Sequence, residues 1–516
     1  MKYSKGLTIA GVLIGFVLLL LVVAGPILSS YLKKYIEQKS NIQVEIIQVN
    51  ILFGTVKFEN IKLSETILNE TKISGVIKSV HINHLGLIKY LFHKDISIGN
   101  IAVSEAILSV ELMPGDTSEN SDMEKEFPAV TIDEFEILNS HFNASTYKKD
   151  SLKLTIDHLS IDKLQYLSSN ILLDAVAFSL GEAYYQTTNG QYHIGWSKAF
   201  CTAGENTILF DSLSAIPVFE AQKFFDKEVY QTDRFSLFIP EVELLTSTGD
   251  FNSANYAFKG SAILKNGHLQ VTRDKNIKRK ENDVKPTLQE VLKSSPLFME
   301  LDSLVIESFK ISYGEIAENE KLYGIVSFDS LDAVISNLKS GKISNGNLTI
   351  DAQALFMNEG NLKAHFEFPY DKNYFDCNGS LNNLEFIRLN QVSVPLSKVN
   401  FSNGKINKLM FNFRADTDSS RGDLLFYYSN LNFAISCNSR GDTSNFKSRV
   451  LTFIADDLVV SDGNPDKNGN VSKGIIREAR NRERFIFNYM WKSIFSGVKS
   501  TVLNNAVKTN KKRWKS

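Results

Sequence analysis

Residues 299–313 read MELDSLVIESFKISY, and this stretch decides how the chain folds. Its apolar side chains recur at every second position within three short groups, the spacing of a strand with one apolar face. An extra polar position separates the groups, first at Asp302-Ser303 and then at Glu307-Ser308. An extra residue turns the following side chains to the wrong face unless the strand bulges or bends there. The stretch therefore predicts short, bent strand segments that wrap around something apolar. The apolar positions are Met299, Leu301, Leu304, Ile306, Phe309, Ile311 and Tyr313.

The same eight-residue pattern, apolar-x-apolar-x-x-apolar-x-apolar, recurs along the chain, and most copies carry Asp or Asn in the middle pair. These residues tolerate turns and bulges because their short side chains hydrogen-bond the local backbone. A longer match aligns residues 128–144 with residues 297–313, so we interpret the chain as two related β-rich halves. Strict copies begin at Val56, Val130, Leu154, Val326 and Ile387, and looser copies begin at Ile96, Leu237 and Met299.

The amino-terminal region is predicted to be a membrane anchor. Residues 6–32 carry no charge and are flanked by lysines. At about 1.5 Å per helical residue they exceed the roughly 30 Å of bilayer hydrocarbon. We therefore expect one uncleaved transmembrane helix with the bulk of the chain exported. A cleaved signal peptide is the alternative, because Val22-x-Ala24 is similar to a cleavage site.

Changes in composition divide the rest of the chain. A highly charged stretch at residues 273–285 and a polar stretch at residues 461–473 both lack an apolar face, which is typical of linkers. We expect five parts: an anchor at 1–34, a first β-rich half at 35–272, a charged linker with a short helix at 273–295, a second β-rich half at 296–460, and a polar linker with a basic helix at 461–516.

The carboxyl-terminal helix is expected within residues 475–507, where the spacing becomes helical. Residues 473–516 contain twelve Lys or Arg and two acids, although the whole chain has a formal net charge of −1. An aromatic face beside a cationic face suits a membrane interface with anionic headgroups. The alternative is a helix that docks on the β-rich body. The residues of the two faces are Phe487, Trp491 and Phe495 on one, and Lys492 and Lys499 on the other.

The sequence offers no recognisable catalytic motif. It contains no Walker loop, no HExxH, no GxSxG and no GxGxxG after a strand. Asp133 and Asp302 occupy matching positions, but turn chemistry accounts for both. The near-zero net charge predicts no attraction to nucleic acid, and three dispersed cysteines predict no metal site. We therefore expect a non-catalytic protein without a cofactor.

Several segments together resemble the AsmA-like family of Gram-negative envelope proteins. They are the stretch at residues 6–32, NIQVEIIQVNILFGTVKFENIKL from residue 41, LGLIKYLF from residue 85, ISIGNIAVSEAILSVEL from residue 96, and VNFSNGKINKLMFNFRADTDSSRGDLLFYYSNLNFAI from residue 399. The resemblance implies a long, strongly curved, trough-like antiparallel sheet, held by one helix in the inner membrane and projecting into the periplasm. It also implies a role in lipid transfer or outer-membrane homeostasis.

An apolar strand face suits this role, because acyl chains could lie along it while headgroups stay in water. The hypothesis is that phospholipid moves along such a groove, with membrane lipids and other envelope proteins as the expected classes of partner. The alternative is an assembly or scaffold factor that holds outer-membrane proteins through exposed strand edges. The candidate groove residues are Phe58, Ile61, Ile132, Phe135, Ile137, Leu301, Leu304 and Ile306.

Overall fold

The computed structural model describes residues 24–38, 41–68, 71–86, 95–113, 129–167, 170–202, 204–246, 257–296, 298–341, 345–435 and 461–513. The chain is mainly β, with few helices, and divides into two compact units. The first unit comprises Met1–Ser214 and Leu245–Ala254, and the second comprises Ala215–Leu244 and Asn255–Ser516. Within each unit the strands form a mixed, mostly antiparallel sheet, which confirms the expected β-rich class.

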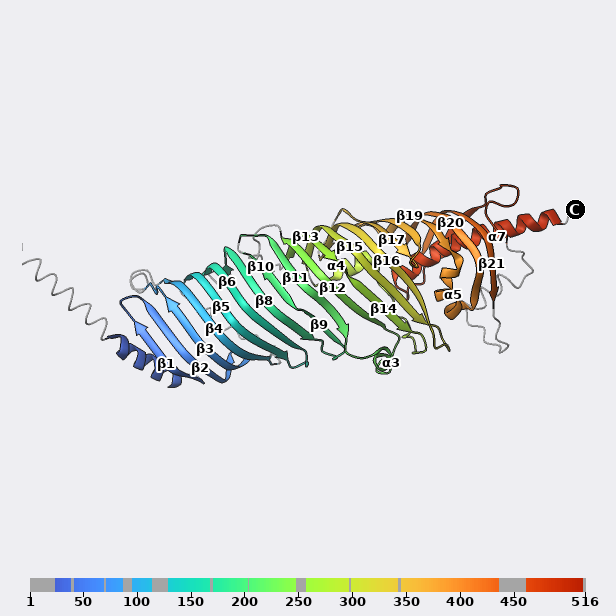
Figure 1. Ribbon diagram of the computed structural model, residues 1–516. Helices are drawn as coiled ribbons and strands as arrows, with labels where there is room; N and C mark the ends of the chain where they lie inside the picture. The colour runs from blue at the N-terminus through green and yellow to red at the C-terminus, as the bar shows by residue number, and fades with distance from the viewer. Residues whose placement is uncertain are drawn as a thin grey trace, which may run out of the picture. The chain divides into compact units, whose positions relative to one another are not determined.

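Apolar and polar side chains alternate along most strands of the first unit, so the two faces of its sheet differ in character. The strands lie side by side in chain order from β1 to β6, and β8 then pairs with β6 (Figure 1). Beyond β8, β10 pairs with β8 and β11 with β10. Their bounds are β1 (Ile42–Asn50), β2 (Thr55–Leu68), β3 (Thr71–Asn83), β4 (Ile96–Leu112), β5 (Val130–Thr146), β6 (Ser151–Leu167), β7 (Asn170–Leu172), β8 (Ala175–Gln186), β9 (Tyr192–Trp196), β10 (Lys198–Cys201) and β11 (Thr207–Pro217).

The second unit begins with β12, which pairs with β14, and from β15 to β22 each strand runs antiparallel to the next. The short helix expected near residue 290 is present as α4, where Thr287 and Glu290 form a capping box. The strands are β12 (Asp233–Thr246), β13 (Ala257–Lys265), β14 (His268–Asp274), β15 (Phe298–Ile316), β16 (Tyr323–Ser340), β17 (Asn347–Phe356), β18 (Gly360–Pro369), β19 (Tyr374–Glu385), β20 (Val399–Asp416), β21 (Ser419–Ile435) and β22 (Lys473–Ala479). The helices are α3 (Ala221–Phe225), α4 (Leu288–Ser294), η1 (Phe386–Leu389), α5 (Asn390–Ser397) and α7 (Ile486–Arg513).

The prediction of a purely antiparallel sheet is wrong at two places. Strand β5 runs parallel to β4, and β15 runs parallel to both β13 and β14. Parallel neighbours need a connection of about a dozen residues or more. Residues 113–129 and 275–297 supply such connections. Both parallel junctions therefore fall where the sequence is polar or charged and has no strand pattern.

The aligned stretches at residues 128–144 and 297–313 form β5 and β15, which share unusual geometry. Asn139 and Ser308 hold equivalent positions, and both have a left-handed backbone, with φ of 47° and 55°. The register of β15 against β16 shifts between Ile306 and Phe309, which confirms the bulge expected at Glu307-Ser308. Since the two strands also both have a parallel neighbour on one side and an antiparallel one on the other, their pairing supports the duplication seen in the sequence.

Two further predictions are corrected. The copy of the repeat that begins at Ile387 is not a strand, because it folds into η1 and α5, and Asn390 instead bonds the backbone of Phe401. The helix expected from residue 475 starts only at Ile486, because residues 473–479 form the strand β22 beside β21. The alternating burial of β22, with Gly474 and Ile476 buried, is that of a strand with one covered face.

Residues 24–38 form a helix, which begins inside the stretch expected to be the anchor. Within the described ranges, no helix has both the length and the apolar character needed to span a bilayer. Most of the anchor expected at residues 6–32 lies outside the described residues, as do the apolar run at 87–92 and the acidic loop at 117–126. The anchor therefore stays a prediction.

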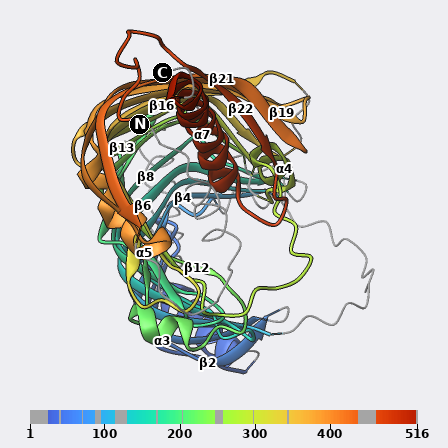
Figure 2. The same cartoon turned by 90° about the vertical axis from the view of Figure 1, so that its right-hand side faces the viewer.

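Helix α7 packs on the sheet of the second unit, inside the curve of its strands (Figure 2). Tyr489 and Val502 join a buried core that fills this face of the sheet. The helix comes close because Gly497 has no side chain: an added Cβ would lie 2.9 Å from atoms of Leu424 and Ile476. The strand face of the second unit is therefore covered.

Candidate functional site

Two rows of apolar side chains cross the first unit from strand to strand. Paired residues in adjacent strands point to the same face, so an unbroken series of apolar pairs makes one continuous apolar surface. We call the face that carries both rows the apolar face. The first row is Ile47, Phe58, Val80, Val103, Ile137, Leu159 and Phe178, and the second is Val49, Val56, Ile82, Ile101, Phe135, Ile161 and Val176.

The opposite face of the same strands is polar. Asn100 donates hydrogen bonds to Glu134 at 3.0 Å and to Glu136 at 3.2 Å. The His158 ring lies 3.4 Å from Glu136, and Lys78 forms an ion pair with Glu105. The two faces of the sheet of the first unit therefore differ, and the charged side chains gather on the face opposite the apolar rows.

The apolar face is open along most of its length. From β2 to β8, every member of the two rows is only partly buried. The buried cluster on this face, formed by Val44, Ile47 and Ile61, lies where Leu32 and Ile36 of the 24–38 helix pack against it. By contrast, the core of the second unit contains side chains as well buried as Tyr370 and Tyr428. The first unit thus presents an apolar surface that its own described elements leave partly exposed.

Five of the predicted groove residues lie on this apolar face. Phe58, Phe135 and Ile137 belong to the two rows. Ile132 extends the surface through its pairs with Ile98 and Leu164, and Ile61 belongs to the buried cluster beside the helix. Ile61 and Ile132 are buried and have a packing role, whereas Phe58, Phe135 and Ile137 are partly exposed and remain available to a ligand.

The remaining three groove candidates lie in the second unit, where Leu301 is buried and the other two are partly buried. Leu301 is only 5% exposed and pairs with Leu338. Leu304 pairs with Ile335, and both Ile335 and Leu338 pack against the buried core. Ile306 pairs with Ala333 and is partly buried. These positions build the fold of the second unit.

The aromatic stripe of α7 is exposed, as a membrane-interface helix requires. Phe487, Trp491 and Phe495 are 47%, 48% and 39% exposed, and the Trp491 and Phe495 rings stack at 6.2 Å. Lys499 is exposed and Lys492 is partly buried. The helix docks on the sheet, as the second alternative expects, and the membrane-interface role of its exposed stripe stays a prediction.

The docking side of α7 consists of small residues that the sequence pattern did not single out. The Ser493 hydroxyl lies 2.7 Å from that of Ser420, and both are fully buried. Ser496 and Ser500 accept hydrogen bonds at 3.0 and 3.2 Å from backbone N–H groups of Arg477 and Ile475 in β22. Small polar residues every fourth position carry no hydrophobic signal, and only their spacing could have identified this side.

Several residues of the apolar rows were also missed. Val80, Val103, Leu159 and Phe178 lie directly between or beside the predicted positions. Each falls at an alternating apolar position, which predicts its face. The alternation does not predict which residue it pairs with in the next strand.

Asp133 and Asp302, which hold matching positions in the sequence, both lie among the described residues. No group of three or more His, Cys, Asp or Glu side chains within them is placed to hold a metal ion. Asp302 falls opposite a left-handed residue, Asn337, where the pairing of β15 with β16 skips a position. Asp133 occupies the same place opposite Lys163 in the first unit. Both carboxylates therefore mark bends in strands.

No family model matches the chain, and no curated protein matches it either.

Proposed function

We propose that this chain is a non-catalytic, membrane-anchored protein of AsmA-like type that binds phospholipid acyl chains along the apolar face of the first unit and guides their movement. The observation that carries the proposal is the pair of continuous, partly exposed apolar rows from β1 to β8. The proposal includes an elongated, trough-like sheet, an inner-membrane anchor at residues 6–32 and a periplasmic location for the strands.

The size of the apolar face suits an acyl chain. Seven strands spaced by about 4.8 Å give a row roughly 29 Å long. A bilayer's hydrocarbon is about 30 Å thick, so one acyl chain reaches about half that distance. Each methylene removed from water contributes about 0.8 kcal/mol, so about ten methylenes on the face would contribute roughly 8 kcal/mol. Similar contacts recur from strand to strand, so a chain could move along the row without a large change in free energy.

The described edges of the sheets favour this proposal over a scaffold that recruits client strands. At β1, the Val49 N–H donates to the Ser29 hydroxyl at 2.9 Å, and Lys33 donates to the Glu45 carbonyl at 2.7 Å. At β22, Ser496 and Ser500 of α7 bind the backbone. Both edges already have partners, so a client strand would have to displace a helix.

A matched pair of charge insertions tests the proposal. Phe178 lies in the first apolar row, and its neighbour Ser179 is exposed on the opposite face. An aspartate among acyl chains costs about 2.5–3.5 kcal/mol, so we expect Phe178→Asp to reduce lipid binding and transfer about ten-fold or more. Ser179→Asp adds the same charge to the polar face and should leave both close to the wild-type level.

The measurements are phospholipid co-purifying with the full-length chain, determined by mass spectrometry, and transfer of a fluorescent phospholipid between vesicles. Circular dichroism melting checks that both variants fold. Equal effects of the two substitutions, or wild-type protein that carries no phospholipid above the detergent background, would refute the proposed function.

A further inference from the structure

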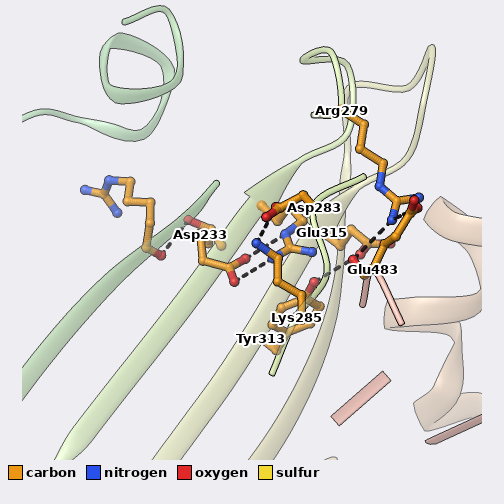
Figure 3. A network of polar contacts seen from close by, with 10 residues as sticks. Asp233, Arg279, Asp283, Lys285, Tyr313, Glu315 and Glu483 are labelled. Atoms are coloured by element: carbon orange, nitrogen blue, oxygen red, sulfur yellow. Dashed lines mark hydrogen bonds and ion pairs between the residues drawn. The ribbon is translucent and has the colours of Figure 1, made fainter. Parts of the chain in front are cut away.

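A network of ion pairs joins β12, β14 and β15 to the loop that precedes α7 (Figure 3). Arg273 binds Asp233 with two hydrogen bonds, of 2.7 and 2.6 Å. Three further cations in the network each form an ion pair with a carboxylate of their own. The further pairs are Lys275 with Glu315, Arg279 with Glu483, and Lys285 with Asp283.

Arg484 is the cation that this network leaves over. It is partly buried, and in the described part of the chain its guanidinium makes no hydrogen bond or ion pair. Burial lowers the pKa of Arg484, and the nearby charges of Arg279 and Arg273 lower it further. Glu315 and Tyr313 attract it, but Glu315 already binds Lys275 and the Tyr313 hydroxyl, the latter at 3.0 Å.

A partly buried guanidinium among other cations is favourable when an anion completes its hydrogen bonds. The guanidinium presents its N–H donors as a planar fork that matches the oxygens of phosphate or carboxylate. Four carboxylates face five cations in this cluster, so one further negative charge would balance it.

Exposed aromatic rings contact residues that also surround this cation. Phe485 and Phe487 are 45% and 47% exposed. Phe485 lies under the cations of Arg273 and Lys285, at 5.7 and 5.0 Å, and the Phe487 ring lies 6.3 Å from that of Tyr313. An anion bound at Arg484 would therefore have apolar surface next to it, which a free inorganic ion cannot use and a lipid can.

We propose that Arg484 binds the phosphate of an anionic phospholipid, with the glycerol and the first methylenes of the acyl chains against Phe485 and Phe487. This inference rests on the proposed function, which supplies the class of ligand. It adds a site for the lipid headgroup in the second unit. The ion pairs of Arg273 and Arg279 hold the surrounding charges in place, so Arg484 alone gains a partner when the lipid binds.

Binding of dihexanoylphosphatidylglycerol, kept below its micelle concentration and measured by calorimetry on the full-length chain, tests the site. We expect Arg484→Gln to weaken binding at least about ten-fold, the effect of losing a charge-assisted pair. Arg484→Lys keeps the charge without the fork and should fall between. Arg477→Gln removes the same charge from an exposed side chain of β22 and should bind like wild type.

Inorganic phosphate is the second probe. It should bind much more weakly than the lipid, and equal affinity would overturn the assignment to a lipid headgroup. Lipid binding by Arg484→Gln at wild-type affinity, with Arg484→Lys equally unaffected, would overturn the site itself. Because this test reads headgroup binding in the second unit, its failure is distinguishable from failure of the proposed function, which the Phe178 and Ser179 variants test in the first unit.

Discussion

Ser308 shows how one residue bends a strand of this protein. It is exposed, it has a φ of 55°, and its backbone N–H donates to Asp332 at 2.9 Å. The skipped register around it restores Phe309 to a buried position. The bulge could be predicted from the sequence, because an extra polar residue interrupts an alternating pattern. The sequence does not predict which residue adopts the left-handed conformation. At the other extra position, Asp302, the left-handed residue is Asn337 on the facing strand.

We predict that Ser308→Val destabilises the β15–β16 pair by about 1–2 kcal/mol, because a β-branched residue is strained at positive φ. Ser308→Gly should be neutral or slightly stabilising, since glycine adopts this conformation freely. Hydrogen exchange of β15 and β16 amides measures the difference, and at 1.4 kcal/mol per factor of ten the valine variant should exchange about five to thirty times faster. Equal exchange in the two variants would show that the bulge does not require this backbone.

Helix α7 and strand β22 show where pattern reading fails at the scale of elements. Aromatic residues at positions 487, 491 and 495 make the strongest apolar stripe, yet this stripe is exposed. The docking side uses Ser493, Gly497 and Thr501, whose small size allows close approach to β21 and β22. Strand β22 itself was missed because its few apolar residues also fit a helical spacing. Tertiary packing determines which side of α7 is buried and whether residues 473–479 form a strand, and a local sequence pattern does not contain that information.

We predict that Gly497→Val loosens α7, because the new side chain collides with Leu424 and Ile476. Overpacking of this kind costs about 1–3 kcal/mol. The amides of Ile475 and Arg477, which donate to α7 serines, should then exchange faster in hydrogen-exchange mass spectrometry. Trp491→Ala, on the exposed side of the same helix, is the control and should leave that exchange unchanged. Protected β22 amides in Gly497→Val would contradict the docking described above.

At the scale of the whole molecule, the sequence predicts the β-rich class, the short helix α4 and the duplication, because these depend on local alternation and turn chemistry. It also predicts which side chains are apolar. It does not predict that Phe58, Val80, Val103 and Ile137 form one row, because that row depends on the register of each strand against the next. Nor does it reveal that the apolar face is partly open in the first unit and filled in the second. The proposed function depends on this difference.

Site-specific photocrosslinking in cells grown with radioactive phosphate tests the central claim most directly. The photoreactive residue p-benzoylphenylalanine is placed at Phe135 or Phe178 on the apolar face, and at Glu134 or Ser179, their exposed neighbours, as controls. We predict that light attaches labelled phospholipid to the protein at Phe135 and Phe178 and leaves Glu134 and Ser179 unlabelled. Label at none of the four positions, or equal label on both faces, would contradict the account.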